Sequence, residues 1–167
     1  MQILLNYNNI LIGMARKLIW DLVGVLMTTV RNPKVHPQAR ELLERFRADF
    51  DETWLWTLDD IRDVIKALNA FELMQYFDAL IGRSHVLMSE TLYRLEDGRI
   101  ISSKPLSYDG NRKNLDILPG SVIDYVLIDD CGEFGMPKDR VIIVPGFVGN
   151  LEHNLELYYR RALQKFE

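Results

Sequence analysis

Short apolar runs alternate with longer segments in which apolar residues recur at helical spacing. The runs are nearly continuous rather than alternating with polar residues, which is typical of strands buried on both faces of a parallel sheet. On this pattern we predict strands at residues 17–22, 53–57, 78–87, 124–130 and 140–147.

Helical spacing fills most of the gaps between these runs. Leu42, Leu43, Phe46 and Phe50, for example, recur at the spacing of one helix face. We predict helices at residues 38–50, 58–77, 111–118 and 150–166, and a hairpin at 90–110 that turns at Asp97-Gly98.

Strands that alternate with helices predict an α/β fold: a Rossmann-like, mainly parallel sheet with helices on both faces. The connections leave no room for a large cap domain. We expect residues 14–167 to form a single domain and residues 1–13 to be an N-terminal extension, since Met14 resembles an alternative start. Trp54 and Trp56 are expected to pack on opposite sides of the sheet.

Charge and cysteine content narrow the classes of partner. The net charge of −4 argues against nucleic acid as a partner, because phosphate backbones need clustered basic charge. Cys131 is the single cysteine, which suits a reducing cytoplasm. Asparagines and basic residues interrupt the apolar N-terminal segment, so it predicts no signal peptide and no membrane span. An extra edge strand or helix is the simplest role for residues 1–13, and a protein partner or self-association through them is the alternative.

Polar residues end three of the predicted strands. Asp21 ends the first, Thr57 the second, and Asp129-Asp130 the strand in "DYVLIDD". Because parallel strands end at one edge of the sheet, we expect these side chains to meet there. Each residue also has a simpler interpretation: aspartates form turns, and Thr57 suits a helix N-cap. Their joint occurrence favours a site.

Together with a lysine, these motifs ("LIWDLVG", "TWLWT", "VLIDD") resemble the haloacid dehalogenase (HAD) superfamily of aspartate-nucleophile phosphatases, in its uncapped form. The stretch "RKNLDILPGSVIDYVLIDD" is more distantly similar to the RNA polymerase II tail phosphatases and NLI-interacting-factor-like proteins. This chain departs from the tail-phosphatase pattern in two respects. Its connection after the first motif is shorter, and Val23 stands in place of the second aspartate of that motif.

The resemblance implies a role for each of these residues. Asp21 would be the nucleophile, Thr57 and Lys113 would hold the phosphoryl group, and Lys104 in "SKP" is the alternative lysine. The metal would be Mg²⁺, held by Asp21, Asp129, Asp130 and the backbone carbonyl of Val23.

Valine at position 23 retains that carbonyl but cannot donate or accept a proton. We therefore predict a Mg²⁺-dependent phosphohydrolase that is weak or specialised, acting on a phosphorylated small molecule or a phosphoprotein. The alternative is a catalytically dead scaffold of the same fold that binds proteins.

Overall fold

The computed structural model describes residues 15–84, 89–107, 113–133, 135–149 and 154–167. Its centre is a seven-stranded sheet in the order β5-β4-β3-β2-β1-β7-β9. The strands are β1 (Lys17–Trp20), β2 (Glu52–Asp60), β3 (Ala79–Arg83), β4 (Glu90–Glu96), β5 (Arg99–Pro105), β7 (Tyr125–Asp129) and β9 (Val141–Ile143).

Five of these strands, β3, β2, β1, β7 and β9, run parallel, and the β4–β5 hairpin adds two antiparallel strands at one edge. A second, two-stranded parallel sheet pairs β6 (Lys113–Asn114) with β8 (Gly135–Met136). The predicted α/β class and mainly parallel sheet are confirmed.

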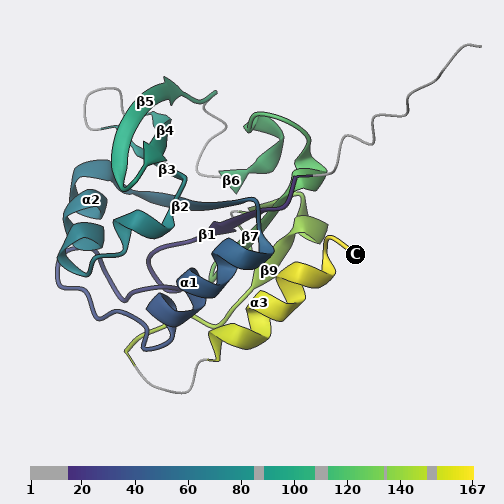
Figure 1. Cartoon of the computed structure of the whole chain (residues 1–167), viewed down its shortest axis with the longest axis horizontal. Helices are drawn as coiled ribbons and strands as arrows, with labels where there is room; N and C mark the ends of the chain where they lie inside the picture. The colour runs from purple at the N-terminus through teal and green to yellow at the C-terminus, as the bar shows by residue number, and fades with distance from the viewer. Residues whose placement is uncertain (1–14, 85–88, 108–112, 134, 150–153) are drawn as a thin grey trace, which may run out of the picture.

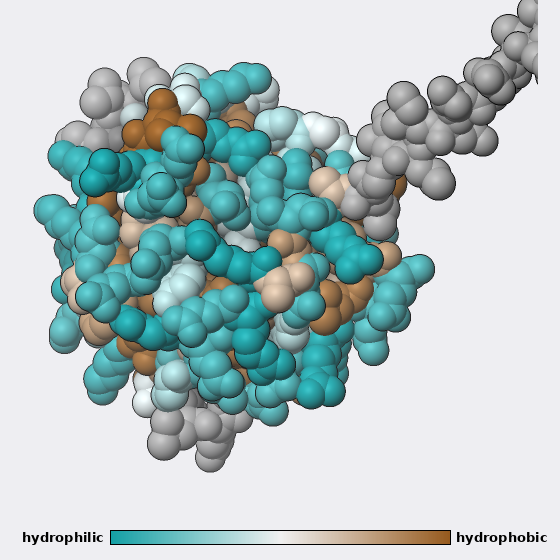
Figure 2. All heavy atoms as spheres, in the orientation of Figure 1, coloured by the Kyte–Doolittle hydropathy of each residue, from teal (hydrophilic) through white to brown (hydrophobic). Residues whose placement is uncertain are grey.

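Three α-helices cover one face of the large sheet: α1 (Ala39–Asp49), α2 (Ile61–Ala70) and α3 (Leu155–Gln164). Their apolar sides share one core with Leu18, Trp20 and Leu55 of the strands. Figure 1 shows α1 and α3 side by side, with α2 closer to the β4–β5 hairpin. Figure 2, in the same orientation, shows a mostly hydrophilic surface here, as expected of amphipathic helices.

Coverage of the other face is lighter. A second core there contains Ile19, Trp54 and Trp56 from the strands, with Leu115 and Leu118 from the connection that precedes β7. The helices on this side are the 3₁₀ turns η2 (Leu115–Ile117) and η3 (Val122–Asp124). Two further 3₁₀ turns are η1 (Met74–Tyr76), which belongs to the first core, and η4 (Lys138–Arg140). Two apolar faces explain why the strands are continuously apolar.

Three local predictions are corrected. In place of the helix predicted at 111–118, the described residues form strand β6 and the 3₁₀ turn η2. Trp54 and Trp56 lie in the same core, because residues two apart in a strand point to the same side of a sheet. The single helix predicted at 58–77 is divided: β2 continues to Asp60, α2 ends at Ala70, and η1 follows. Glu72, at φ 56°, has a left-handed backbone that no helix continues through.

β2 leads directly into α2, so no domain is inserted at that point, and no cap is present among the described residues. Within that same part of the chain, no helix is long and apolar enough to cross a membrane. The predicted extension, residues 1–13, lies outside the described residues.

Candidate functional site

Strand register brings the predicted polar residues to one edge of the sheet. Trp20 of β1 pairs with Leu55 of β2 on one side and with Ile128 of β7 on the other. Asp21 therefore follows β1 beside Asp129, and its backbone N–H donates to the Ile128 carbonyl at 2.8 Å. Thr57 lies at the same carboxyl edge on β2, and it is buried.

Lys113 joins the two buried carboxylates. Its Nζ lies 2.6 Å from Asp21 Oδ1 and 2.6 Å from Asp129 Oδ2. The lysine comes from the small sheet, in β6, and it is 2% exposed. Lys104, the alternative lysine, lies exposed on the outermost strand β5. The structure thus places Lys113 in the acidic cluster and Lys104 outside it.

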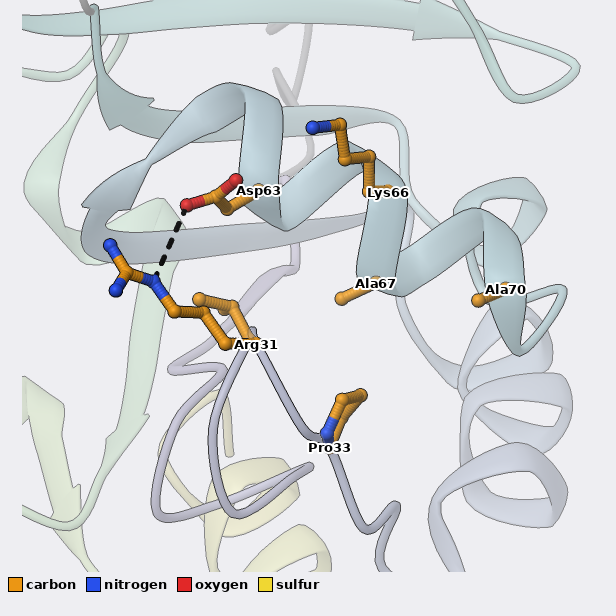
Figure 3. Close-up of a pocket in the computed structure, with 7 residues that line it drawn as sticks. Arg31, Pro33, Asp63, Lys66, Ala67 and Ala70 are labelled. Atoms are coloured by element: carbon orange, nitrogen blue, oxygen red, sulfur yellow. Dashed lines mark ion pairs between the residues drawn. The ribbon is translucent and has the colours of Figure 1, made fainter.

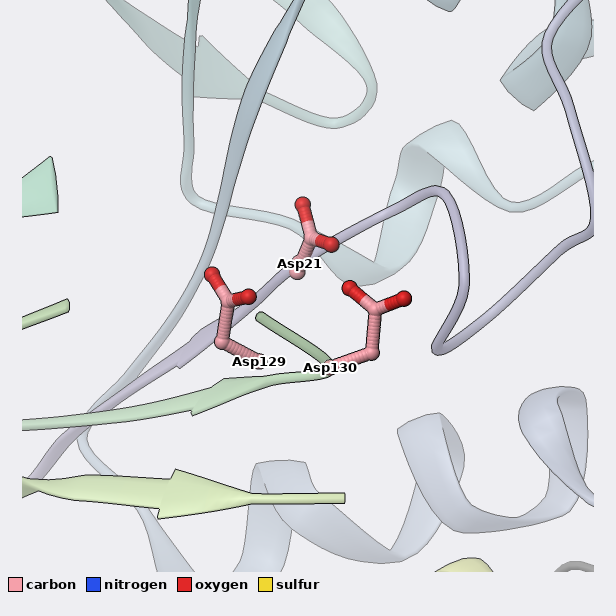
Figure 4. A group of neighbouring side chains, drawn as sticks. All are labelled: Asp21, Asp129 and Asp130. Carbon is pink, nitrogen blue, oxygen red and sulfur yellow. The ribbon is translucent and has the colours of Figure 1, made fainter. Parts of the chain in front are cut away.

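Asp130 completes the group of acidic side chains. Carboxylate oxygens of Asp21, Asp129 and Asp130 all lie within 4.8 Å of one another. Figure 4 shows the three side chains gathered in one group. Gly24 makes this approach possible, because a Cβ there would lie 2.0 Å from Asp130 Oδ2. We call Asp21, Lys113, Asp129 and Asp130 the acidic site.

Burial and mutual repulsion perturb these groups. Burial raises the pKa of Asp21 to about 7; Asp129 and Asp130 add to this rise, and Lys113 opposes it. Burial and Asp129 likewise raise the pKa of Asp130. Burial works to lower the pKa of Lys113, but attraction to Asp21 and Asp129 outweighs it and leaves that pKa raised.

Three carboxylates face one ammonium group, so the fully ionised acidic site carries two uncompensated negative charges. Oxygen ligands of this kind suit a hard divalent cation such as Mg²⁺. Val23 borders the site, and no hydrogen bond within the described residues uses its carbonyl. The residues therefore fit the implied ligand set of Asp21, the Val23 carbonyl, Asp129 and Asp130.

Thr57 is not a helix cap. Asp60 caps α2 by accepting a hydrogen bond from the Arg62 backbone N–H. The Thr57 hydroxyl instead donates to Asp59 Oδ2 at 2.9 Å, and the Asp59 backbone N–H donates to Thr57 Oγ1 at 3.2 Å. Thr57 and Asp59 line the same small depression, of about 120 Å³, as the acidic site.

Asp59 is the site residue that the sequence analysis missed. The sequence pattern predicts Asp59 at the start of a helix, whereas in the structure it belongs to β2 and lies beyond Thr57 at the sheet edge. The available signal was the Thr-x-Asp spacing at the end of an apolar strand, where the two short polar side chains hydrogen-bond each other.

A larger depression, of about 550 Å³, lies elsewhere, between α2 and the segment that contains Val30, Arg31 and Pro33 (Figure 3). We call it the α2 depression. Its charged groups are exposed, and its ion pair, Arg31 with Asp63, spans 4.0 Å. None of the predicted site residues line it.

No protein-family model matches this chain, and no curated protein sequence matches it. The fold and the geometry at the sheet edge define an α/β protein with a buried acidic site.

Proposed function

We propose that this protein is a Mg²⁺-dependent phosphohydrolase of the HAD type, with Asp21 as its nucleophile. The observation that supports this most is the pair of 2.6 Å contacts that join Lys113 to Asp21 and Asp129. A buried lysine placed against two carboxylates at the carboxyl edge of a parallel sheet suits a phosphoryl group, which needs both a nucleophile and positive charge.

In the first step, an Asp21 carboxylate oxygen attacks phosphorus, and the bond from phosphorus to the leaving oxygen breaks. Lys113 supplies positive charge beside the attacking oxygen. Thr57 lines the same depression. Bound Mg²⁺ supplies further charge neutralisation. In the second step, water attacks phosphorus, releases inorganic phosphate and regenerates the Asp21 carboxylate.

Val23 determines which substrates suit this site. The valine side chain cannot protonate a leaving oxygen, and assistance of that kind is worth about 10²–10⁴ in rate. Phosphoryl groups on good leaving groups, such as aryl or acyl phosphates, depend least on this assistance. We therefore propose a specialised phosphohydrolase that turns over alkyl phosphates slowly.

One observation bears on the alternative, a scaffold without catalysis. A chain that had lost its chemistry would have little reason to keep Lys113 and two aspartates buried, because buried charges are costly unless they serve a purpose.

Cys131 is an unpaired, half-buried cysteine beside the site, which suits a reducing compartment such as the cytoplasm.

The test is hydrolysis of an aryl phosphate with and without Mg²⁺, comparing the wild-type protein with Asp21→Asn. The proposal expects turnover that needs Mg²⁺ and disappears in the variant. If wild type and Asp21→Asn release the same amount of phenol, Asp21 is no nucleophile and the scaffold is the better account.

A further inference from the structure

The hydrolytic second step needs a group that accepts a proton from water, and position 23 offers none. The small depression contains one carboxylate outside the acidic site, Asp59. It is half-buried at the carboxyl end of β2 and so borders the space in which a phosphoryl group on Asp21 would lie.

The other carboxylates at the site are already engaged. Asp21 carries the phosphoryl group in the proposed reaction. Asp129 uses both oxygens: Oδ1 accepts from the Cys131 backbone N–H at 2.7 Å and Oδ2 from Lys113 at 2.6 Å. Asp130 Oδ2 is enclosed by Gly24 and Gly146, and its other interactions are with the acidic site.

Asp59 differs from these groups in two respects. It makes no ion pair with any basic side chain of the described residues. Its Oδ2 is fixed by the Thr57 hydroxyl, whereas Oδ1 accepts no hydrogen bond from the described part of the chain. One oxygen is therefore oriented and the other is available to water.

We propose that Asp59 is the general base of the second step and takes the role that an acidic residue at position 23 would have had. This inference rests on the proposed function. A water proton passes to the Asp59 carboxylate as the water oxygen bonds to phosphorus. The bond from phosphorus to the Asp21 oxygen breaks, and its electron pair returns to Asp21.

The experiment compares wild type with Asp59→Asn in rapid-mixing assays with an aryl phosphate and Mg²⁺. Asp60→Asn is the matched control: it removes one negative charge at the next residue, and asparagine caps a helix as well as aspartate does. Two quantities are measured: the rate of the first phenol release, and the phosphate bound to protein after acid quenching.

The expected result for Asp59→Asn is an unchanged first release followed by steady turnover that is slower by about 10²-fold. Phosphoenzyme should then accumulate to about one phosphate per chain, which is the sign of a blocked second step. Asp60→Asn should behave as wild type does.

Three results would overturn the assignment. Equal steady rates in Asp59→Asn and Asp60→Asn would show that Asp59 is not the base. A slower first release in Asp59→Asn, with no accumulated phosphoenzyme, would mean that Asp59 only positions Thr57. If wild type released phenol no faster than Asp21→Asn, the proposed function itself would be wrong. This outcome is distinct from the other two.

Discussion

The acidic site and the α2 depression are opposites in size and in electrostatics. The α2 depression has a volume of about 550 Å³, whereas the small depression that the acidic site lines has a volume of about 120 Å³. Yet Arg31 in the depression is 85% exposed and lies 4.0 Å from Asp63, whereas Lys113 is buried and 2.6 Å from each of two carboxylates.

Volume is therefore a poor guide to chemistry in this protein. Charge interactions are screened in water and strengthened where water is excluded. Each charge in the acidic site therefore matters to its neighbours, as the raised pKa of Asp21 indicates, whereas the charges around the α2 depression are largely independent. Substitutions in the two regions test that contrast.

Lys113→Met should cause the largest loss. Removing the ammonium leaves buried carboxylates without compensation, and breaking a buried ion pair costs about 3–5 kcal/mol. Urea unfolding of the metal-free protein at pH 8 measures this. Lys104→Met on exposed β5 is the control and should change stability little. A loss below about 1 kcal/mol for Lys113→Met would contradict the importance assigned to this pair.

Val23→Asp should raise phosphatase activity, since it introduces a proton donor and acceptor at the rim of the acidic site. General acid–base assistance would increase the turnover of alkyl phosphates by about 10²-fold and that of aryl phosphates by less. Val23→Asn controls for size and polarity and should give no increase. If the two variants have equal activity, proton transfer at position 23 is not what limits the reaction.

The pH dependence of stability should differ between wild type and Asp21→Asn. The pKa of Asp21 is about 7 in the folded protein and ordinarily 3.8, so folding favours its protonated form. The resulting stabilisation is complete below pH 3.8 and is lost as pH rises to about 7.

With metal chelated, unfolding free energies measured from pH 5 to pH 8 should therefore fall by about 2–3 kcal/mol more in wild type than in Asp21→Asn. Parallel curves for the two proteins would mean that Asp21 ionises in its ordinary range.

Arg31→Ala should have the smallest effect. Its ion pair with Asp63 is long and exposed, and such pairs contribute about 0–1 kcal/mol. We expect stability within about 0.5 kcal/mol of wild type and unchanged hydrolysis of an aryl phosphate. A large loss in either assay would show that the α2 depression is coupled to the acidic site after all.

Sequence pattern was sufficient for the fold class and for three strand ends. Asp21, Thr57 and Asp129 could be placed together because parallel strands in register end at one sheet edge, and the register is as expected. The choice of Lys113 over Lys104 could not be derived from periodicity. It depends on β6, a two-residue strand too short to leave a pattern.

Asp59 was missed for a related reason. Strand length at a sheet edge depends on pairing with neighbours, and β2 extends to Asp60 because it pairs there with Arg83 of β3. The local sequence "LDDIRD" resembles a helix start, and only tertiary pairing shows that the helix begins two residues later than Asp59. The unequal covering of the sheet faces is likewise a tertiary property.

The role of Asp21 as nucleophile is tested best by finding the covalent intermediate. The protein would be mixed with an aryl phosphate and Mg²⁺, quenched in acid, digested, and its peptides analysed by mass spectrometry. We predict a phosphoryl group on Asp21, absent from the Asp21→Asn variant and from samples without Mg²⁺. Hydrolysis by wild type with the Asp21 peptide unmodified at every quench time, or with phosphate on another residue, would contradict the account.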